Sequence, residues 1–173
     1  ARYLQGLGVQ PGDRVAVTGK NSPEWASAYL AALYAGGVVV PIDYQLHSRD
    51  ISGLMGRAGV KAVFVDTEKY DDFDAPSKGA KISLAPDREN YIFNFPQDQL
   101  ADRATRDEED LAAILFTSGT TGSAKGVMLT HKNITSDALL AQGNLYIRHD
   151  DIFYSLLPLH HSYTMLAVFI ESI

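Results

Sequence analysis

One stretch of the 173-residue chain combines the residue types that bind phosphate. It spans residues 114–127 and reads ILFTSGTTGSAKGV, with no carboxylate to repel an anion. Glycines let a backbone turn its N–H groups toward an anion at close range. Hydroxyls can bond phosphate oxygens or a hydrated metal ion, and a lysine adds a positive point charge. The candidate binding residues are Thr117, Ser118, Gly119, Thr120, Thr121, Gly122 and Lys125.

This stretch differs from the Walker loop, G-x-x-x-x-G-K-S/T, which opens directly into a helix. Gly119 and Gly122 lie too close together, Lys125 does not directly follow a glycine, and strand-like residues follow where a helix should begin. Phosphate would therefore bind in a nest of backbone N–H groups rather than on a helix dipole. Composition alone leaves an ordinary polar β-turn as the alternative.

The first part of the chain predicts strands alternating with helices. Strands are expected over residues 14–18, 38–42 and 60–65, with helices over 23–35 and 48–59 between them. Ser22 followed by Pro23 and Glu24 is a strong signal for a helix start. Because the run 38–42 is apolar throughout, that strand should be buried on both faces. The βαβαβ pattern predicts an α/β fold, a mostly parallel sheet flanked by helices on both faces.

The later residues predict a less regular arrangement. Residues 66–110 should form an acidic connecting region with short strands over 82–84 and 91–93. Beyond the loop we expect a strand over 127–129, a helix with Thr130 as its N-cap, a strand over 152–157 and an apolar helix over 163–173. Both ends of the chain lack helix start or stop signals, so we expect a piece of a larger protein, truncated at both ends.

Composition limits the classes of function. The chain is 46% hydrophobic and has no cysteines, which is ordinary for a globular domain and excludes disulfides and thiolate metal sites. No apolar run approaches the length of a membrane span. The net charge is −6, the acidic excess lies in residues 66–110, and no basic stripe is present. Nucleic-acid binding is therefore not supported.

Three stretches carry a resemblance to one family. TSGTTGSAKGVMLTH resembles the signature of the adenylate-forming superfamily, which includes acyl-CoA and aryl-CoA synthetases, peptide-synthetase adenylation domains and luciferases. PGDRVAV and NSPEWASAYLAALYAGGVVVPID resemble its N-terminal subdomain, and LLPLHHSYT resembles its P-L-F/H-H motif. The resemblance implies that residues 1–173 are part of the N-terminal AMP-binding domain. Residues 1–65 would be the scaffold, 66–110 the acidic connecting region, and 111–173 the phosphate loop, helix and acyl-side strand and helix.

The family reaction has two steps. A carboxylate attacks the α-phosphate of ATP to give an acyl adenylate and pyrophosphate, and a thiol, often coenzyme A, then displaces AMP. By resemblance, residues 117–125 would wrap the β- and γ-phosphates, Thr117 would help to place Mg²⁺, and His161 would line the acyl side as the candidate catalytic residue. His160, His161, Ser162 and Tyr163 together most resemble long-chain fatty acyl-CoA synthetases, whereas aryl ligases and adenylation domains more often have Phe at the place of His160.

The resemblance implies a cytoplasmic ligase for a carboxylic acid, most simply a fatty acid, with ATP and coenzyme A as its other substrates. Peripheral membrane association of the full-length protein stays open, and the oligomeric state is not predicted. The family segments that hold adenine, ribose and the catalytic lysine are not recognised in this sequence, so we expect residues 1–173 alone to be inactive. Two alternatives remain: a peptide-synthetase adenylation domain or aryl-CoA ligase, and a catalytically inactive nucleotide-binding scaffold.

The adjacent histidines also invite a metal-site interpretation. Neighbouring residues point in different directions in a strand or helix, and the helical metal spacing is i, i+4. Metal binding by His160 and His161 is therefore disfavoured, and a role in packing, at a helix start or beside a ligand is expected instead.

Overall fold

The structure, a computed structural model, describes residues 1–77, 79–95, 102–117 and 124–173. Within these ranges six strands form one sheet in the order β4-β3-β1-β2-β5-β6. All neighbouring strands are parallel except β5 and β6, which are antiparallel. The mostly parallel sheet predicted from the sequence is confirmed.

The strands are β1 (Arg14–Thr18), β2 (Val38–Ile42), β3 (Val60–Val65), β4 (Ala80–Ser83), β5 (Leu111–Thr117) and β6 (Lys125–Thr130). The α-helices are α1 (Arg2–Gly6), α2 (Pro23–Tyr34), α3 (Ser48–Ala58), α4 (Thr67–Tyr70), α5 (His131–Asn144) and α6 (Ser162–Thr164). Irregular helical turns follow at Ile92–Asn94, Met165–Phe169 and Ile170–Ser172.

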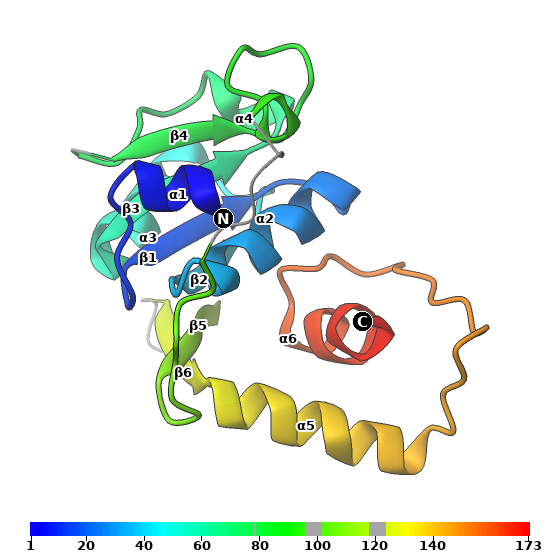
Figure 1. Ribbon diagram of the computed structural model, residues 1–173. Coiled ribbons are helices and arrows are strands. Elements are labelled where there is room, and N and C mark those ends of the chain that lie inside the picture. Colours follow the sequence, from blue (N-terminus) through cyan, green and yellow to red (C-terminus); the bar gives the residue numbers. More distant parts are fainter. Residues whose placement is uncertain (78, 96–101, 118–123) are drawn as a thin grey trace.

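Helices cover both faces of the sheet (Figure 1), as predicted. Val15 and Val17 of β1 pack in one core with Trp25 and Tyr29 of α2. Ala16, between the two valines, belongs to a second core with the buried residues of α3. Successive side chains of a strand point to opposite faces, so the apolar run of β1 is buried on both sides.

Local sequence signals start and stop the helices. The Ser22 hydroxyl accepts the backbone N–H of Trp25 at 3.1 Å, and proline occupies the first turn of α2. Thr130 and Asn133 form a reciprocal capping box at the start of α5. Gly59 ends α3 with φ +62°, a left-handed conformation that glycine adopts without the cost of a Cβ. The sequence predicts all three of these helix ends, because each depends on residues that are close together in the chain.

The last part of the chain packs on α2, and the C-terminus lies between α2 and α5 (Figure 1). The Tyr29 hydroxyl donates to the Met165 sulfur at 2.9 Å. The Phe169 ring meets the rings of Trp25 and Tyr29 edge-on. The predicted helix over 163–173 is therefore helical but irregular: α6 continues into a π-helical and then a 3-10 turn.

Two predicted strands are wrong. Residues 91–93 begin a 3-10 turn rather than a strand. Residues 152–157 form no strand, and Ile152 and Tyr154 are 94% and 81% exposed. Asn21, in the loop before α2, holds this segment instead: its amide donates to the Leu157 carbonyl at 2.8 Å and accepts the Leu159 N–H at 2.8 Å. A mainly apolar run without a neighbouring strand to pair with did not form a sheet.

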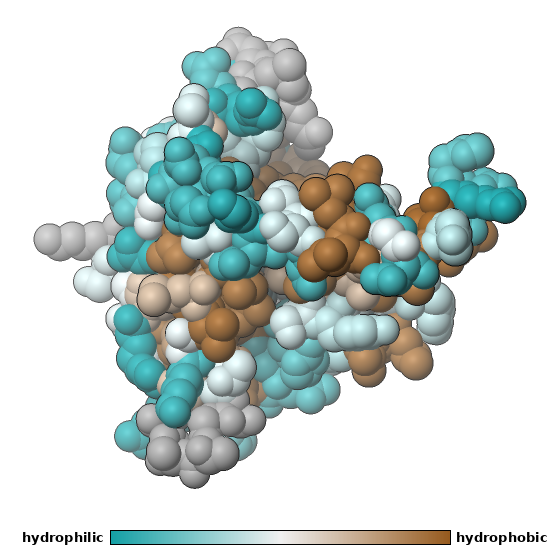
Figure 2. Space-filling model, turned by 90° about the horizontal axis from the view of Figure 1, so that it is seen from below, coloured by the Kyte–Doolittle hydropathy of each residue, from teal (hydrophilic) through white to brown (hydrophobic). Residues whose placement is uncertain are grey.

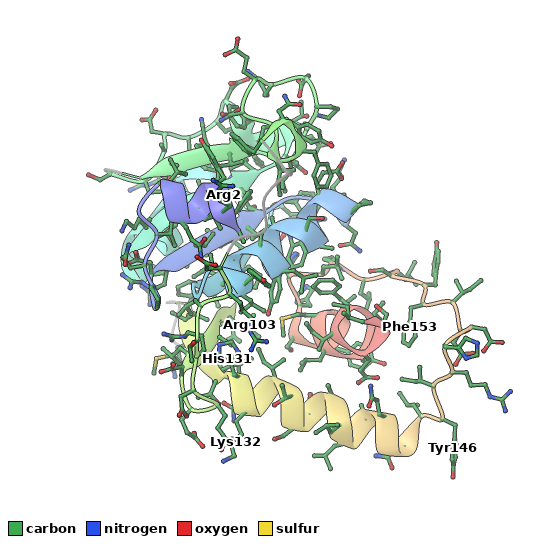
Figure 3. All side chains as sticks on the ribbon, viewed as in Figure 1. Arg2, Arg103, His131, Lys132, Tyr146 and Phe153 are labelled. Atoms are coloured by element: carbon green, nitrogen blue, oxygen red, sulfur yellow. The ribbon has the colours of Figure 1, made fainter. Side chains whose placement is uncertain are left out.

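The outer surface near α5 is partly apolar. Apolar side chains are visible on the face seen from below (Figure 2). At the start of α5, Lys132 pairs with Glu108 and Glu109 at 2.9 Å each, whereas Tyr146 beyond its far end points away from the body of the molecule (Figure 3). Exposed large apolar residues of α5 and the following loop are Leu139, Leu140, Leu145, Tyr146, Ile152, Tyr154, Leu156 and Leu157. No helix in the described ranges is both long and apolar enough to cross a membrane.

Candidate functional site

A cavity of about 1130 Å³ lies at the edge of the sheet where the parallel strands end. Its wall includes the carboxyl ends of β2 and β5, residues of α3, Val127 and Leu129 of β6, and residues of the segment from His160 to Leu166. The α3 residues lie on one face of the sheet, and the segment around α6 packs on the other. Open α/β sheets bind ligands outside the carboxyl ends of their strands, so this cavity has the position of a ligand site.

The lining combines apolar and charged groups, which suits a ligand with both kinds of surface. The apolar part is Ile42, Leu46, Leu54, Leu115, Phe116, Val127, Leu129 and Leu166. The polar part is Asp43, Arg49, Asp50, Arg57, Thr117, His160, His161 and Ser162.

One described end of the predicted phosphate loop lies in the wall of this cavity, and the other end pairs with it. Thr117 is the last residue of β5 and lines the cavity, and Lys125 opens β6 directly opposite Thr117 in the antiparallel register. Lys125 is exposed and shares a strand face with Val127 and Leu129, which both line the cavity. The remaining predicted loop residues lie outside the described residues: Ser118, Gly119, Thr120, Thr121 and Gly122.

Helix α3 holds the hairpin in place from the side. One Arg57 guanidinium N–H donates to the Ala124 carbonyl, just before β6, at 2.7 Å. The same guanidinium lies 5.7 Å from the centre of the Phe116 ring, close enough for a cation–π contact. Sequence analysis gave Arg57 no role, because a basic residue in the last turn of a helix is explained by its favourable interaction with the helix dipole.

The two histidines have different surroundings. His161 is exposed and lines the cavity, whereas the His160 side chain is only 7% exposed. Their imidazole centres are 4.4 Å apart, and His160 Nε2 lies 3.6 Å from Asp43 Oδ1. Neither ring nitrogen of His160 has a hydrogen-bond partner among the described residues. His161 thus offers its ring to a ligand, and His160 lies beside it as a buried neighbour.

The electrostatics of His160 follow from this geometry. Burial lowers the pKa of His160, Asp43 opposes that shift, and the neighbouring His161 adds to it. Burial prevails because a charged imidazolium loses more hydration there than one carboxylate at 3.6 Å restores. His160 is therefore neutral at pH 7. Asp43 was missed in the sequence, although a first carboxylate directly after a buried strand is a signal for a site at the carboxyl edge.

Comparison with known proteins finds similarity along nearly the whole chain. A family model described as AMP-binding enzyme matches residues 1–171. The 4-coumarate–CoA ligase 1 of Petroselinum crispum is 32% identical over 180 residues, which cover 97% of this chain and 33% of the relative. The 2-succinylbenzoate–CoA ligase of Bacillus cereus is 32% identical over 159 residues, which cover 92% of this chain and 31% of the relative. The chain thus spans about a third of the length of these relatives.

Solved structures agree in fold. The crystal structure of ATP-bound MatB from Rhodopseudomonas palustris matches with a TM-score of 0.89 and 31% sequence identity, covering 99% of this chain and 35% of that chain. The inhibitor-bound N-terminal domain of FACL13 from Mycobacterium tuberculosis matches with a TM-score of 0.84 and 26% identity, covering 98% of this chain and 44% of that chain.

Proposed function

The chain belongs to the AMP-binding enzyme family, and from that premise we propose that it is part of an ATP-dependent, AMP-forming ligase that joins a carboxylic acid to coenzyme A. The observation that carries the proposal is that Thr117 and His161 line one cavity at the carboxyl edge of the sheet, with Lys125 directly opposite Thr117 in the β5–β6 pair. In this assignment residues 1–65 are scaffold and residues 111–173 carry the phosphate loop and the acyl side.

In the first chemical step the enzyme must stabilise the negative charge of the phosphates and of the leaving pyrophosphate. An oxygen of the acid attacks the α-phosphorus of ATP, and the bond to the β-phosphate oxygen breaks with its electron pair leaving on pyrophosphate. Residues 117–122 and Lys125 bind the β- and γ-phosphates, so Lys125 offsets charge that builds up on the leaving pyrophosphate. Arg57 supports this loop indirectly, because it fixes the Ala124 carbonyl rather than a phosphate.

Mg²⁺ and coenzyme A complete the proposed reaction. Mg²⁺ at nucleotides is held largely by phosphate oxygens and water, with few protein ligands, so the Thr117 hydroxyl at the cavity edge fits as a single ligand. When bound, the ion neutralises phosphate charge. Among the described residues no group of three or more His, Asp or Glu side chains could hold a metal on its own. In the second step the thiol of coenzyme A attacks the acyl carbonyl and AMP leaves, with His161 beside the acyl group.

The acid is proposed only as a carboxylate with an apolar body. The long-chain subtype predicted from residues 160–163 remains a prediction, as do cytoplasmic location and peripheral membrane association. Two of the similar proteins are named for 4-coumarate and 2-succinylbenzoate, so an aryl acid is the second candidate. Both classes suit a cavity whose lining is apolar with charged groups interspersed.

The test is acid-dependent exchange of pyrophosphate into ATP by the intact protein, without coenzyme A, with fatty, aryl and amino acids in parallel. Exchange with fatty acids would support the adenylating step and the long-chain subtype. Exchange with aryl acids alone would identify the protein as an aryl ligase. Exchange with amino acids alone would identify it as a peptide-synthetase adenylation domain. Tight Mg·ATP binding without exchange for any acid would overturn the ligase in favour of a nucleotide-binding scaffold.

A further inference from the structure

Asp43, His160 and His161 form a connected row at the cavity wall. Asp43 directly follows β2, and its Oδ1 accepts the backbone N–H of Gln45 at 2.9 Å. The same Oδ1 lies 3.6 Å from His160 Nε2, and the His160 ring centre lies 4.4 Å from that of His161. The row therefore runs from a fixed strand end, through a buried ring, to an exposed ring that lines the cavity.

The burial pattern separates the roles of the two rings. Both nitrogens of His160 are inaccessible to solvent and lack hydrogen-bond partners among the described residues. A ligand in the cavity can therefore reach the exposed His161 ring, whereas the two ring nitrogens of His160, which also lines the cavity, are buried. A buried ring without partners for its nitrogens is costly, and a phenyl ring would fill a similar space without that cost. Packing alone thus gives no reason for a histidine at this position, but proximity to Asp43 does.

The backbone around His161 is already fixed. Its N–H donates to the Pro158 carbonyl at 3.1 Å, and its carbonyl accepts the Met165 N–H at 2.9 Å. Its side chain, however, is exposed, and within the described ranges its ring lies at a tilt against the ring of His160. The His160 ring is therefore in a position to limit the orientation of the His161 ring.

We propose that Asp43 and His160 are positioning residues that orient the His161 ring toward the acid substrate. Asp43 orients the neutral His160 ring by attracting its Nε2–H, and the His160 ring limits the rotation of His161. This inference rests on the proposed function, because it names residues that act on the acid side of the same site.

The test uses the intact enzyme and the pyrophosphate exchange assay, with an acid that the wild type accepts. His160→Phe keeps a ring next to His161 but removes the group that Asp43 attracts. Asp43→Asn keeps the size of the side chain and removes its charge. For each variant we expect the KM for the acid to rise about tenfold or more, because small misplacement of a group that positions substrate has large effects. The KM for ATP should stay near that of the wild type, and the midpoint of thermal unfolding should not fall.

The double variant Asp43→Asn with His160→Phe sharpens the test. If the two residues act as one unit, the double variant should raise the KM for the acid no more than the worse single variant. His149→Gln serves as the matched control, because His149 is exposed and does not line the cavity.

Three results would overturn the inference. An unchanged KM for the acid in both single variants would remove the positioning role and leave the proposed function standing. A parallel rise in the KM values for acid and ATP, with a lower unfolding midpoint, would show a structural role only. Absence of exchange by the wild type with any acid would overturn the proposed function, and the positioning role with it.

Discussion

The interior of the sheet and its carboxyl edge differ in how their side chains are buried and paired. In the interior, Val15, Ala16 and Val17 are fully buried in apolar cores, and α2, which packs on Val15 and Val17, begins with a satisfied cap. At the carboxyl edge, His160 is buried without hydrogen-bond partners among the described residues, and Arg49 and Asp50 face the cavity from exposed positions. Departures from good packing and pairing are expected where a protein binds ligands.

This difference between interior and edge predicts which substitutions should lower the stability of the fold and which should affect only the reaction. Interior side chains contribute to the free energy of unfolding through buried area and close packing. Edge side chains are exposed or lie next to the cavity, so their loss removes few packing contacts. The comparison would fail if edge substitutions unfolded the protein or if interior substitutions left its stability unchanged.

The largest effect should come from Trp25→Ala in the interior. Trp25 is fully buried and contacts the rings of Tyr29 and Phe169. Removing this ring leaves a cavity, so we expect the free energy of unfolding to fall by about 3–5 kcal/mol. Urea unfolding followed by circular dichroism measures it.

Trp25→Phe is the matched control, because it retains a ring and removes an indole N–H that has no partner among the described residues. It should cost clearly less than Trp25→Ala. Equal losses for the two variants would show that the N–H matters more than the packing and would contradict the description of this core as apolar.

The second effect is expected at the edge, from Lys125→Ala. Lys125 is exposed, so thermal stability should not change. If Lys125 stabilises charge on the leaving pyrophosphate, the exchange rate of the intact protein should fall by roughly 10²–10³-fold, the usual cost of losing one such group. Lys132→Ala is the control, since Lys132 pairs with Glu108 and Glu109 on the surface near α5. A Lys125→Ala protein that binds Mg·ATP as tightly as the wild type would contradict the phosphate role.

The interior could be predicted from the sequence because its signals are local. The apolar runs of β1, β2 and β3 and the cap at Ser22 each depend on residues close together in the chain. The strand predicted over 152–157 is wrong because an apolar run does not specify a pairing partner, and Asn21 holds that segment with side-chain hydrogen bonds.

The edge could be predicted only in part. Thr117, Lys125 and His161 were singled out by type. The structure places Thr117 and His161 in the wall of one cavity and Lys125 opposite Thr117, whereas their roles remain predictions. The contacts of Arg57 with Ala124 and of Asp43 with His160 join residues far apart in the chain. A single sequence carries no signal for such pairs, because hydrophobic period and capping rules act over one element at a time.

The smallest effect concerns pH and compares His160 at the carboxyl edge with His131 at the start of α5. Burial lowers the pKa of His160, and it also lowers that of His131, where Arg106 adds to the shift and Asp110 opposes it. In the unfolded chain both histidines should titrate near their ordinary pKa of about 6.5. The unfolded state therefore binds more protons than the folded state as the pH falls through that value, and the free energy of unfolding must fall with it.

Stability from these histidines should thus be fully present above about pH 7.5 and decline between pH 7 and 5.5, with a slope that is a fraction of the roughly 1.4 kcal/mol per pH unit of one full proton. His160→Phe should flatten the slope, because a phenyl ring takes up no proton, whereas His149→Gln should not. His131 will keep part of the slope in both variants. An unchanged slope in His160→Phe would mean that Asp43 cancels the effect of burial, so that the pKa of His160 is the same in the folded and the unfolded chain.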